Sequence, residues 1–197
     1  MNSLHFQNRL RYQAAVMWWS EGNDLDSLHF TFKIQTEDRR CVSECLEIAH
    51  QLFEAANGQY GHLCWREEYW SKTIIDDWTG RSGRPEGGRA QGTDRKQHLP
   101  GVYWANFFGP VYAAFFGEDR LESAPAYEKR RGQESWVLLT SATPDEWDAA
   151  ETVEREAAIR EHLGSDAFFL LDEPKRLTRA PTFVRVRNRR ANTKGPG

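Results

Sequence analysis

Two pairs of adjacent carboxylates are the residues whose type and spacing come nearest to a chemical site. They are Glu67 with Glu68 and Asp76 with Asp77, and the tryptophans around them are Trp65, Trp70 and Trp78. Paired carboxylates can chelate a divalent cation or share the acid and base steps of a hydrolysis. Adjacent acidic residues usually alternate faces or face solvent, however, and no lysine stands at the spacing of a phosphodiesterase site. The pattern favours an exposed acidic rim on an aromatic base, so these residues are predicted to bind a partner.

Other candidate sites have less support in the sequence. Cys41 and Cys45 stand four residues apart, and Cys64 with His62 could complete a metal site, but no Cys-x2-Cys or His-x3-His pair accompanies them. Residues 79–98 contain five glycines without a Gly-Lys-Ser/Thr sequence, which does not suit a phosphate-binding loop. No Ser/His/Asp, Cys/His or Gly-x-Ser-x-Gly arrangement stands out. We therefore expect no metal, no cofactor and no enzymatic activity.

The charge is divided unevenly along the 197 residues. Residues 172–197 contain eight Lys or Arg and two acidic residues, a net charge of +6, which leaves −9 on residues 1–171 out of a total of −3. Nucleic-acid binding needs clustered Lys and Arg, so an acidic body argues against it. Charge complementarity favours a basic macromolecular partner.

The sequence also bears on where the protein acts. No apolar run approaches the roughly 20 residues that span a bilayer, and the first residues lack the pattern of a signal peptide. Three cysteines are too few and odd in number for a disulfide framework. We expect a cytoplasmic protein without a membrane partner.

In the first half of the chain, the apolar residues recur first at every second position and then, over residues 36–57, at every 3.6 positions. Residues 10–19 and 28–34 alternate and predict an antiparallel hairpin, and residues 62–69 predict a third strand. Residues 36–57 follow a 3.6-residue period and predict a helix that begins at the N-cap Thr36 and stops at Asn57. Residues 70–78 predict a short helix or a turn. The expected buried stripe of the helix comprises Cys41, Cys45, Ile48, Ala49, Leu52, Phe53 and Ala56.

The second half contains the densest aromatic segment, residues 99–117. Residues 102–106 predict a strand, and Pro110 and Gly117 bracket a short helix over 111–116. A polar connection over 118–133, a strand over 136–140 and a helix from Thr143 to Leu163 follow. Residues 167–171 predict a last core strand and 182–187 an edge strand. The expected inner face of the second long helix comprises Trp147, Ala150, Val153, Ala157 and Ala158.

This order of elements is not a regular βα alternation. It predicts an α+β fold, a mostly antiparallel sheet with two main helices packed on one face. We expect one domain over residues 1–171, interrupted by a mobile loop at 79–98, and a basic, partly disordered tail over 172–197.

Four segments in succession resemble the immunity protein 52 family of bacterial polymorphic-toxin systems. They are LPGVYWANFFGPVYAAFFG at 99–117, the strand that ends at Leu139 and Thr140, TPDEW at 143–147 and LGSDAFF at 163–169. The resemblance covers residues 8–171, and the first segment is its most specific part. The glycine-rich loop and the basic tail contribute nothing to it.

The resemblance implies a non-enzymatic antidote used in interbacterial competition, for example beside type VI secretion. Such a protein binds a cognate toxin, typically a restriction-endonuclease-like nuclease, and blocks its active site or an adjacent surface. The acidic body suits a nuclease whose own surface must be basic. The alternatives are a metal-dependent hydrolase that uses the paired carboxylates and a module that binds a peptide or a small molecule among the aromatics.

Overall fold

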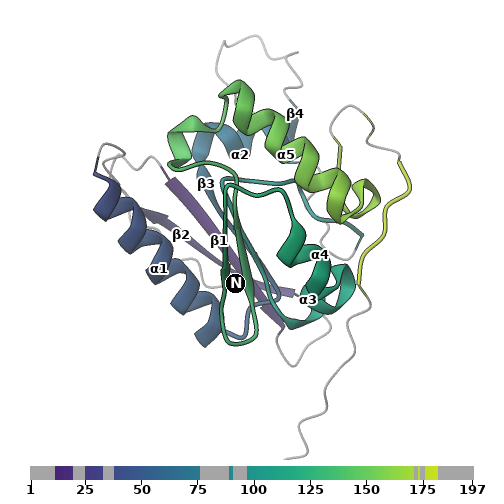
Figure 1. The fold of residues 1–197 in the computed structure, drawn as a ribbon, viewed down its shortest axis with the longest axis horizontal. Coiled ribbons are helices and arrows are strands. Elements are labelled where there is room, and N and C mark those ends of the chain that lie inside the picture. The colour runs from purple at the N-terminus through teal and green to yellow at the C-terminus, as the bar shows by residue number, and fades with distance from the viewer. Residues whose placement is uncertain are drawn as a thin grey trace, which may run out of the picture.

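A six-stranded antiparallel sheet forms the centre of the protein (Figure 1). The computed structural model describes residues 12–19, 25–32, 38–75, 89–90, 97–170, 173 and 176–181, with the backbone alone for 12–19, 25–32, 74–75 and 89–90. The order of the strands is β2-β1-β3-β6-β8-β7, and every neighbouring pair is antiparallel. Their bounds are β1 Tyr12–Trp19, β2 Leu25–Phe32, β3 Tyr60–Trp65, β6 Ala105–Phe108, β7 Glu128–Arg131 and β8 Trp136–Leu139.

Five α-helices accompany the sheet in the part of the chain that the structure describes. They are α1 Arg39–Ala55, α2 Arg66–Thr73, α3 Pro110–Phe116, α4 Glu118–Ser123 and α5 Ala150–Leu163. A separate two-stranded ribbon pairs β4 Ile74–Ile75 with β5 Arg89–Ala90. None of these helices has the length and apolar character that a membrane span requires.

The predicted α+β fold with an antiparallel sheet is confirmed, but the helices cover both faces rather than one. Alternate strand residues belong to two cores, since Phe107 and Val137 pack with α1 whereas Phe108 and Leu138 pack with α3, α4 and α5. Successive strand side chains point to opposite faces, and here both faces are apolar. An all-apolar run such as Trp136–Leu139 therefore serves two cores at once.

The aromatic segment 99–117 lies almost entirely in the interior. Its helix α3 begins at Pro110 and ends before Gly117, as the sequence predicts, whereas its strand is β6, three residues later than the predicted start at Val102. Trp104 is buried and donates its indole N–H to the carbonyl of Ser141 at 3.1 Å. Residues 101–104 form no regular element but are buried, so this segment lines the core and offers no stacking surface.

Much of the predicted buried stripe of α1 is confirmed, since Ala49 and Phe53 lie in the core and Cys41, Cys45 and Ala56 pack against it. The core side of α1 comprises Val42, Leu46, Ala49 and Phe53, while Ile48 is 46% exposed and Cys41 and Cys45 are half-buried. The N-cap of α1 is Asp38 rather than Thr36, because its carboxylate accepts the N–H groups of Arg40 and Cys41. Asn57 adopts the expected left-handed conformation after the helix.

The predicted helix from Thr143 to Leu163 is interrupted. Pro144–Glu146 form a 3₁₀ turn in which the Glu146 carboxylate accepts the Thr143 N–H, and the extended backbone of Ala149 separates this turn from α5. The inward residues of α5 are Thr152, Glu156, Ile159 and Leu163, whereas the predicted inner residues Ala150, Val153, Ala157 and Ala158 are exposed. The prediction placed only apolar residues on the inner face of this helix, whereas Glu156 is also buried there.

Three further segments differ from the prediction. Residues 66–69 are helical rather than the end of a strand, and they form one helix with 70–73, for which a short helix was one of the two predictions. Helix α4 and strand β7 occupy the stretch predicted as a connection. Of the strand predicted over 167–171, the described residues 167–170 contribute one parallel bridge, Phe168 to Leu99, and no strand. Within the predicted mobile loop 79–98, residues 89–90 form β5, while 79–88 and 91–96 lie outside the described residues, as does the predicted edge strand 182–187.

Gly109 occupies a position where the chain has no room for a side chain. A Cβ atom there would lie 1.9 Å from the carbonyl oxygen of Gly58, which is backbone and cannot swing away. We expect Gly109→Ala to lower the free energy of unfolding by about 1–3 kcal/mol, the usual range for overpacking, in urea denaturation. The exposed neighbour Ala114→Ser is the control, with an expected change within about 0.5 kcal/mol. Equal stabilities of the two variants would contradict this close approach.

Candidate functional site

Helix α2 separates the two carboxylates of the first acidic pair. It follows β3 directly, and its residues Glu67 and Glu68 occupy adjacent positions on the first turn. Residues next to each other on a helix lie about 100° apart, so one can face the core while the other faces solvent. The Glu68 side chain is fully buried, whereas the Glu67 side chain is about half exposed.

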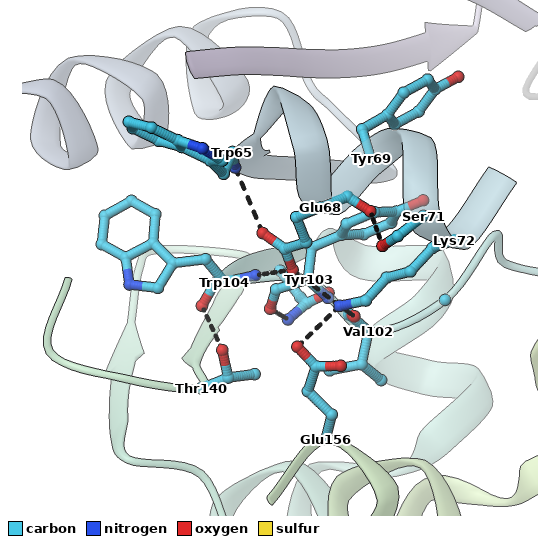
Figure 2. A network of polar contacts seen from close by, with 12 residues as sticks. Trp65, Glu68, Tyr69, Ser71, Lys72, Val102, Tyr103, Trp104, Thr140 and Glu156 are labelled. Atoms are coloured by element: carbon cyan, nitrogen blue, oxygen red, sulfur yellow. Dashed lines mark hydrogen bonds and ion pairs between the residues drawn. The ribbon is translucent and has the colours of Figure 1, made fainter. Parts of the chain in front are cut away.

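The buried Glu68 belongs to a cluster that joins α2 to α5. The Lys72 Nζ donates to Glu68 Oε1 at 2.8 Å, to Glu156 Oε1 at 2.7 Å and to the carbonyl of Val102 at 2.7 Å (Figure 2). An ammonium group has three N–H donors, so these contacts use all of them. We call Glu68, Lys72 and Glu156 the buried cluster.

Backbone groups complete the surroundings of Glu68. Its Oε1 accepts the Trp104 N–H at 2.9 Å, and its Oε2 accepts the Trp65 N–H at 3.3 Å (Figure 2). Three donors therefore point at one carboxylate. Glu68 thus connects β3, α2 and the segment before β6, and its role in this arrangement is to hold the fold together.

The electrostatics of the buried cluster reflect its burial. Burial raises the pKa of Glu68 above its ordinary value, although Lys72 and the two N–H groups act against this. Burial likewise raises the pKa of Glu156 to about 7, with Lys72 opposing. Burial alone would lower the pKa of Lys72, but the two carboxylates outweigh it and the pKa lies above its ordinary value. Lys72 is therefore a cation at neutral pH.

Aromatic rings enclose the other side of the buried cluster. The Lys72 Nζ lies 5.1 Å from the centre of the Tyr103 ring, and His62 stacks on the same ring at 4.2 Å. Tyr69 of α2 stacks further along, 5.9 Å from His62. These contacts exclude water from the cluster and strengthen its ion pairs.

The seven predicted partner-binding residues do not form one rim. Glu68 is buried and bound to Lys72, so its assignment to an exposed acidic rim is wrong. Trp65 is only partly accessible and packs beside the α1 core. Glu67 and Trp70 are exposed on α2, Trp70 at 43%, with the Arg66 guanidinium 4.7 Å from its ring. Asp76, Asp77 and Trp78 lie outside the described residues.

A Ser/His/Glu cluster that the sequence did not reveal joins α1 to the β7–β8 turn. His50 Nε2 lies 2.9 Å from Ser135 Oγ and 3.6 Å from Glu54 Oε1, and Ser135 Oγ donates to Glu54 at 2.8 Å. A catalytic triad places the acid on the other imidazole nitrogen from the serine, whereas here both meet Nε2. Ser135 is also buried. The geometry is that of a clamp on the turn, since Glu54 also accepts the Gln133 N–H.

The cysteine pair of α1 does not have the character of a metal site. Burial raises the pKa of the Cys45 thiol to about 11, so without a metal ion the thiol stays protonated at neutral pH. Burial also raises the pKa of Cys64 well above its ordinary value. Within the described ranges, no three His, Cys, Asp or Glu side chains gather in a way that could hold a metal ion.

The fold and the buried cluster together define an α+β protein with helices on both faces of an antiparallel sheet, in which an internal ion-pair cluster ties α2 to α5. The chain matches no protein-family model, no curated protein and no solved structure.

Proposed function

We propose that the protein is a cytoplasmic immunity protein that binds and neutralises a toxin, a basic nuclease. The proposal starts from the resemblance of residues 8–171 to the immunity protein 52 family. The net charge of −9 on residues 1–171 supports it, because opposite charges speed association between two proteins.

The observation that carries the proposal is the outer face of α2. A tryptophan exposed at 43% stands beside an exposed glutamate, Glu67, on a helix whose inner face is fixed by the buried cluster. Tryptophan is among the residues that most often dominate binding energy at interfaces. A helix that is already held in place loses little freedom on binding, which favours affinity.

The neighbouring helix α5 adds to the negative charge of this region. Its exposed residues include Glu151, Glu154 and Glu161 and no Lys or Arg, while Arg155 turns inward to donate to the Thr140 carbonyl. The Lys72–Glu156 contact places α5 beside α2. The glutamates of α5 outnumber its partly buried arginines Arg155 and Arg160, so this helix has a net negative charge that suits a basic partner.

The test uses the toxin domain encoded beside the gene of this protein. We expect the two purified proteins to form a stable complex that suppresses nuclease activity. Trp70→Ala should weaken the complex at least tenfold, about 1.4 kcal/mol, in calorimetry or surface plasmon resonance. Glu67→Lys should mainly slow association at low salt.

The control variant is Tyr127→Ala, which removes another aromatic side chain of similar exposure, 53%, away from α2. It should leave affinity unchanged. If Trp70→Ala and Tyr127→Ala both bind like the wild type, the outer face of α2 is not the interface. If no complex forms and the nuclease stays active, the proposed function is wrong.

A further inference from the structure

The buried cluster has an odd number of charges. It contains two carboxyl groups and one ammonium group, with side-chain exposures of 0% for Glu68, 20% for Lys72 and 10% for Glu156. If both carboxyl groups ionise, one negative charge is left unbalanced in the interior, which is unfavourable. If one carboxyl group keeps its proton, the cluster is neutral. The composition of the cluster therefore couples it to proton uptake.

The geometry indicates that Glu156 holds this proton. Glu68 accepts three hydrogen bonds, from Lys72, Trp104 and Trp65, and each one favours its ionised form. Among the described residues, Glu156 accepts a hydrogen bond only from Lys72. Its side chain also keeps some access to solvent. The raised pKa of Glu156, about 7, agrees with this assignment.

We propose that Glu68, Lys72 and Glu156 form a proton-sensitive latch, which holds α5 against α2 while Glu156 is protonated and loosens when Glu156 ionises. The latch joins positions 84 residues apart in the sequence. A protonated Glu156 still accepts from Lys72 through its carbonyl oxygen, whereas the ionised form adds a buried charge that water entry would relieve. This inference does not depend on the proposed function.

Other charged and titratable groups face the cluster from each element around it. Arg160 of α5 acts on Glu156 and remains a cation. Cys64 of β3 stays protonated, because burial raises its pKa well above the ordinary value. His62 of β3 and Tyr103 lie on the aromatic side of Lys72. All of these groups are retained in a Glu156 variant, so the difference between the two proteins reports Glu156 together with its coupling to them.

The direction of the pH effect follows from linkage. In the closed state the pKa of Glu156 is about 7, and in the open state it returns toward 4.5, so the closed state binds more protons between these values. The contribution of Glu156 to the closed state of the latch is complete below about pH 4.5 and is lost as the pH rises through 7. The pKa of Glu68 is raised as well and acts in the same direction. Lys72 stays charged throughout this range.

Hydrogen–deuterium exchange at pH 5 and pH 8, corrected for the intrinsic exchange rate, measures the opening of the latch. Amides of α2 and α5 in the wild type should open about 70-fold more at pH 8 than at pH 5, given the two pKa values of Glu156. Glu156→Gln keeps an oxygen for Lys72 but cannot ionise. The increase in opening from pH 5 to pH 8 should therefore be several-fold smaller in this variant than in the wild type. Glu67→Gln, the exposed control on the same helix, should behave like the wild type.

Two results would overturn the latch. One is equal pH dependence in the wild type and in Glu156→Gln, and the other is an opening of α1 amides that rises as much as that of α2 and α5. A second measurement needs no variant: the side-chain carboxyl ¹³C shift of Glu156 should titrate near pH 7. A midpoint near 4.5 would contradict the proposal even if Glu156→Gln failed to fold.

Discussion

Lys72→Met is expected to lower the free energy of unfolding by about 3–5 kcal/mol, the usual cost of removing one partner from a buried ion pair. Methionine retains most of the apolar length of the side chain but removes the ammonium group. Glu68 would then remain fully buried and face two N–H groups without a cation. Urea denaturation followed by circular dichroism measures the loss.

Two further variants separate the charge from the side chain. The exposed Lys129 donates to the Ala124 carbonyl at 3.1 Å, so Lys129→Met also removes a lysine bond and should cost about 1 kcal/mol or less. The triple variant Glu68→Gln, Lys72→Met, Glu156→Gln removes every charge of the cluster, while the amide oxygen introduced by Glu68→Gln can still accept the Trp104 N–H. It should regain most of the stability. A Lys72→Met protein within about 1 kcal/mol of the wild type would contradict the structural role of the cluster.

The second large effect is expected at Asn106, in the aromatic segment. Its amide oxygen accepts the Tyr103 N–H at 2.9 Å, and its amide nitrogen donates to the carbonyls of Tyr103 at 2.7 Å and Leu138 at 3.3 Å. Asn106→Leu retains a side chain of similar shape and makes none of these bonds. Because each buried polar group that loses its partner costs about 1–3 kcal/mol, we expect a loss of about 2–4 kcal/mol in the free energy of unfolding.

The matched control is Gln51→Leu, which removes an exposed amide that bonds Glu47 on α1. Its unfolding free energy should change by no more than about 0.5 kcal/mol in the same urea titration. Asn106→Asp retains the acceptor for Tyr103 but loses both donors, and it should be destabilised as well. Similar urea midpoints for Asn106→Leu and Gln51→Leu would show that the bonds of Asn106 to Tyr103 and Leu138 do not stabilise the fold.

Local signals predicted the β1–β2 hairpin, β8 and the ends of α3 well, whereas they missed β7. The alternating apolar residues near the N-terminus predicted the β1–β2 hairpin, and Pro110 and Gly117 predicted both ends of α3. Such signals act within a few residues, where backbone conformation is set by side-chain type. The same rules could not predict that helices cover both faces, because that depends on which strands become neighbours.

The sequence contains a signal for one ion pair of the buried cluster but none for the other. Glu68 and Lys72 stand four residues apart, the spacing of an ion pair on a helix, but Glu68 was predicted to lie in a strand and Lys72 in a short helix or turn after it. Glu156 lies on another helix, and no local pattern indicates that it meets Lys72. The rule that places charged residues outside failed at Glu156 because only the tertiary fold brings it to Lys72. It failed at Glu68 because its local partner Lys72 is itself buried by the fold and because the distant Trp104 N–H also binds it.

The order of the strands also has a consequence for how the chain folds. Hairpins β1–β2 and β7–β8 are local in sequence, whereas the central pair β3–β6 joins Tyr60 to Phe108 across a long intervening segment. Closing such a loop costs chain entropy before its contacts form, so non-local pairing is slow. We expect the two hairpins to form early and the meeting of β3 with β6 to limit the folding rate. Substitutions in the two hairpins and between β3 and β6 should then slow refolding, because these contacts are already made in the transition state, while substitutions in elements that pack later should mainly speed unfolding.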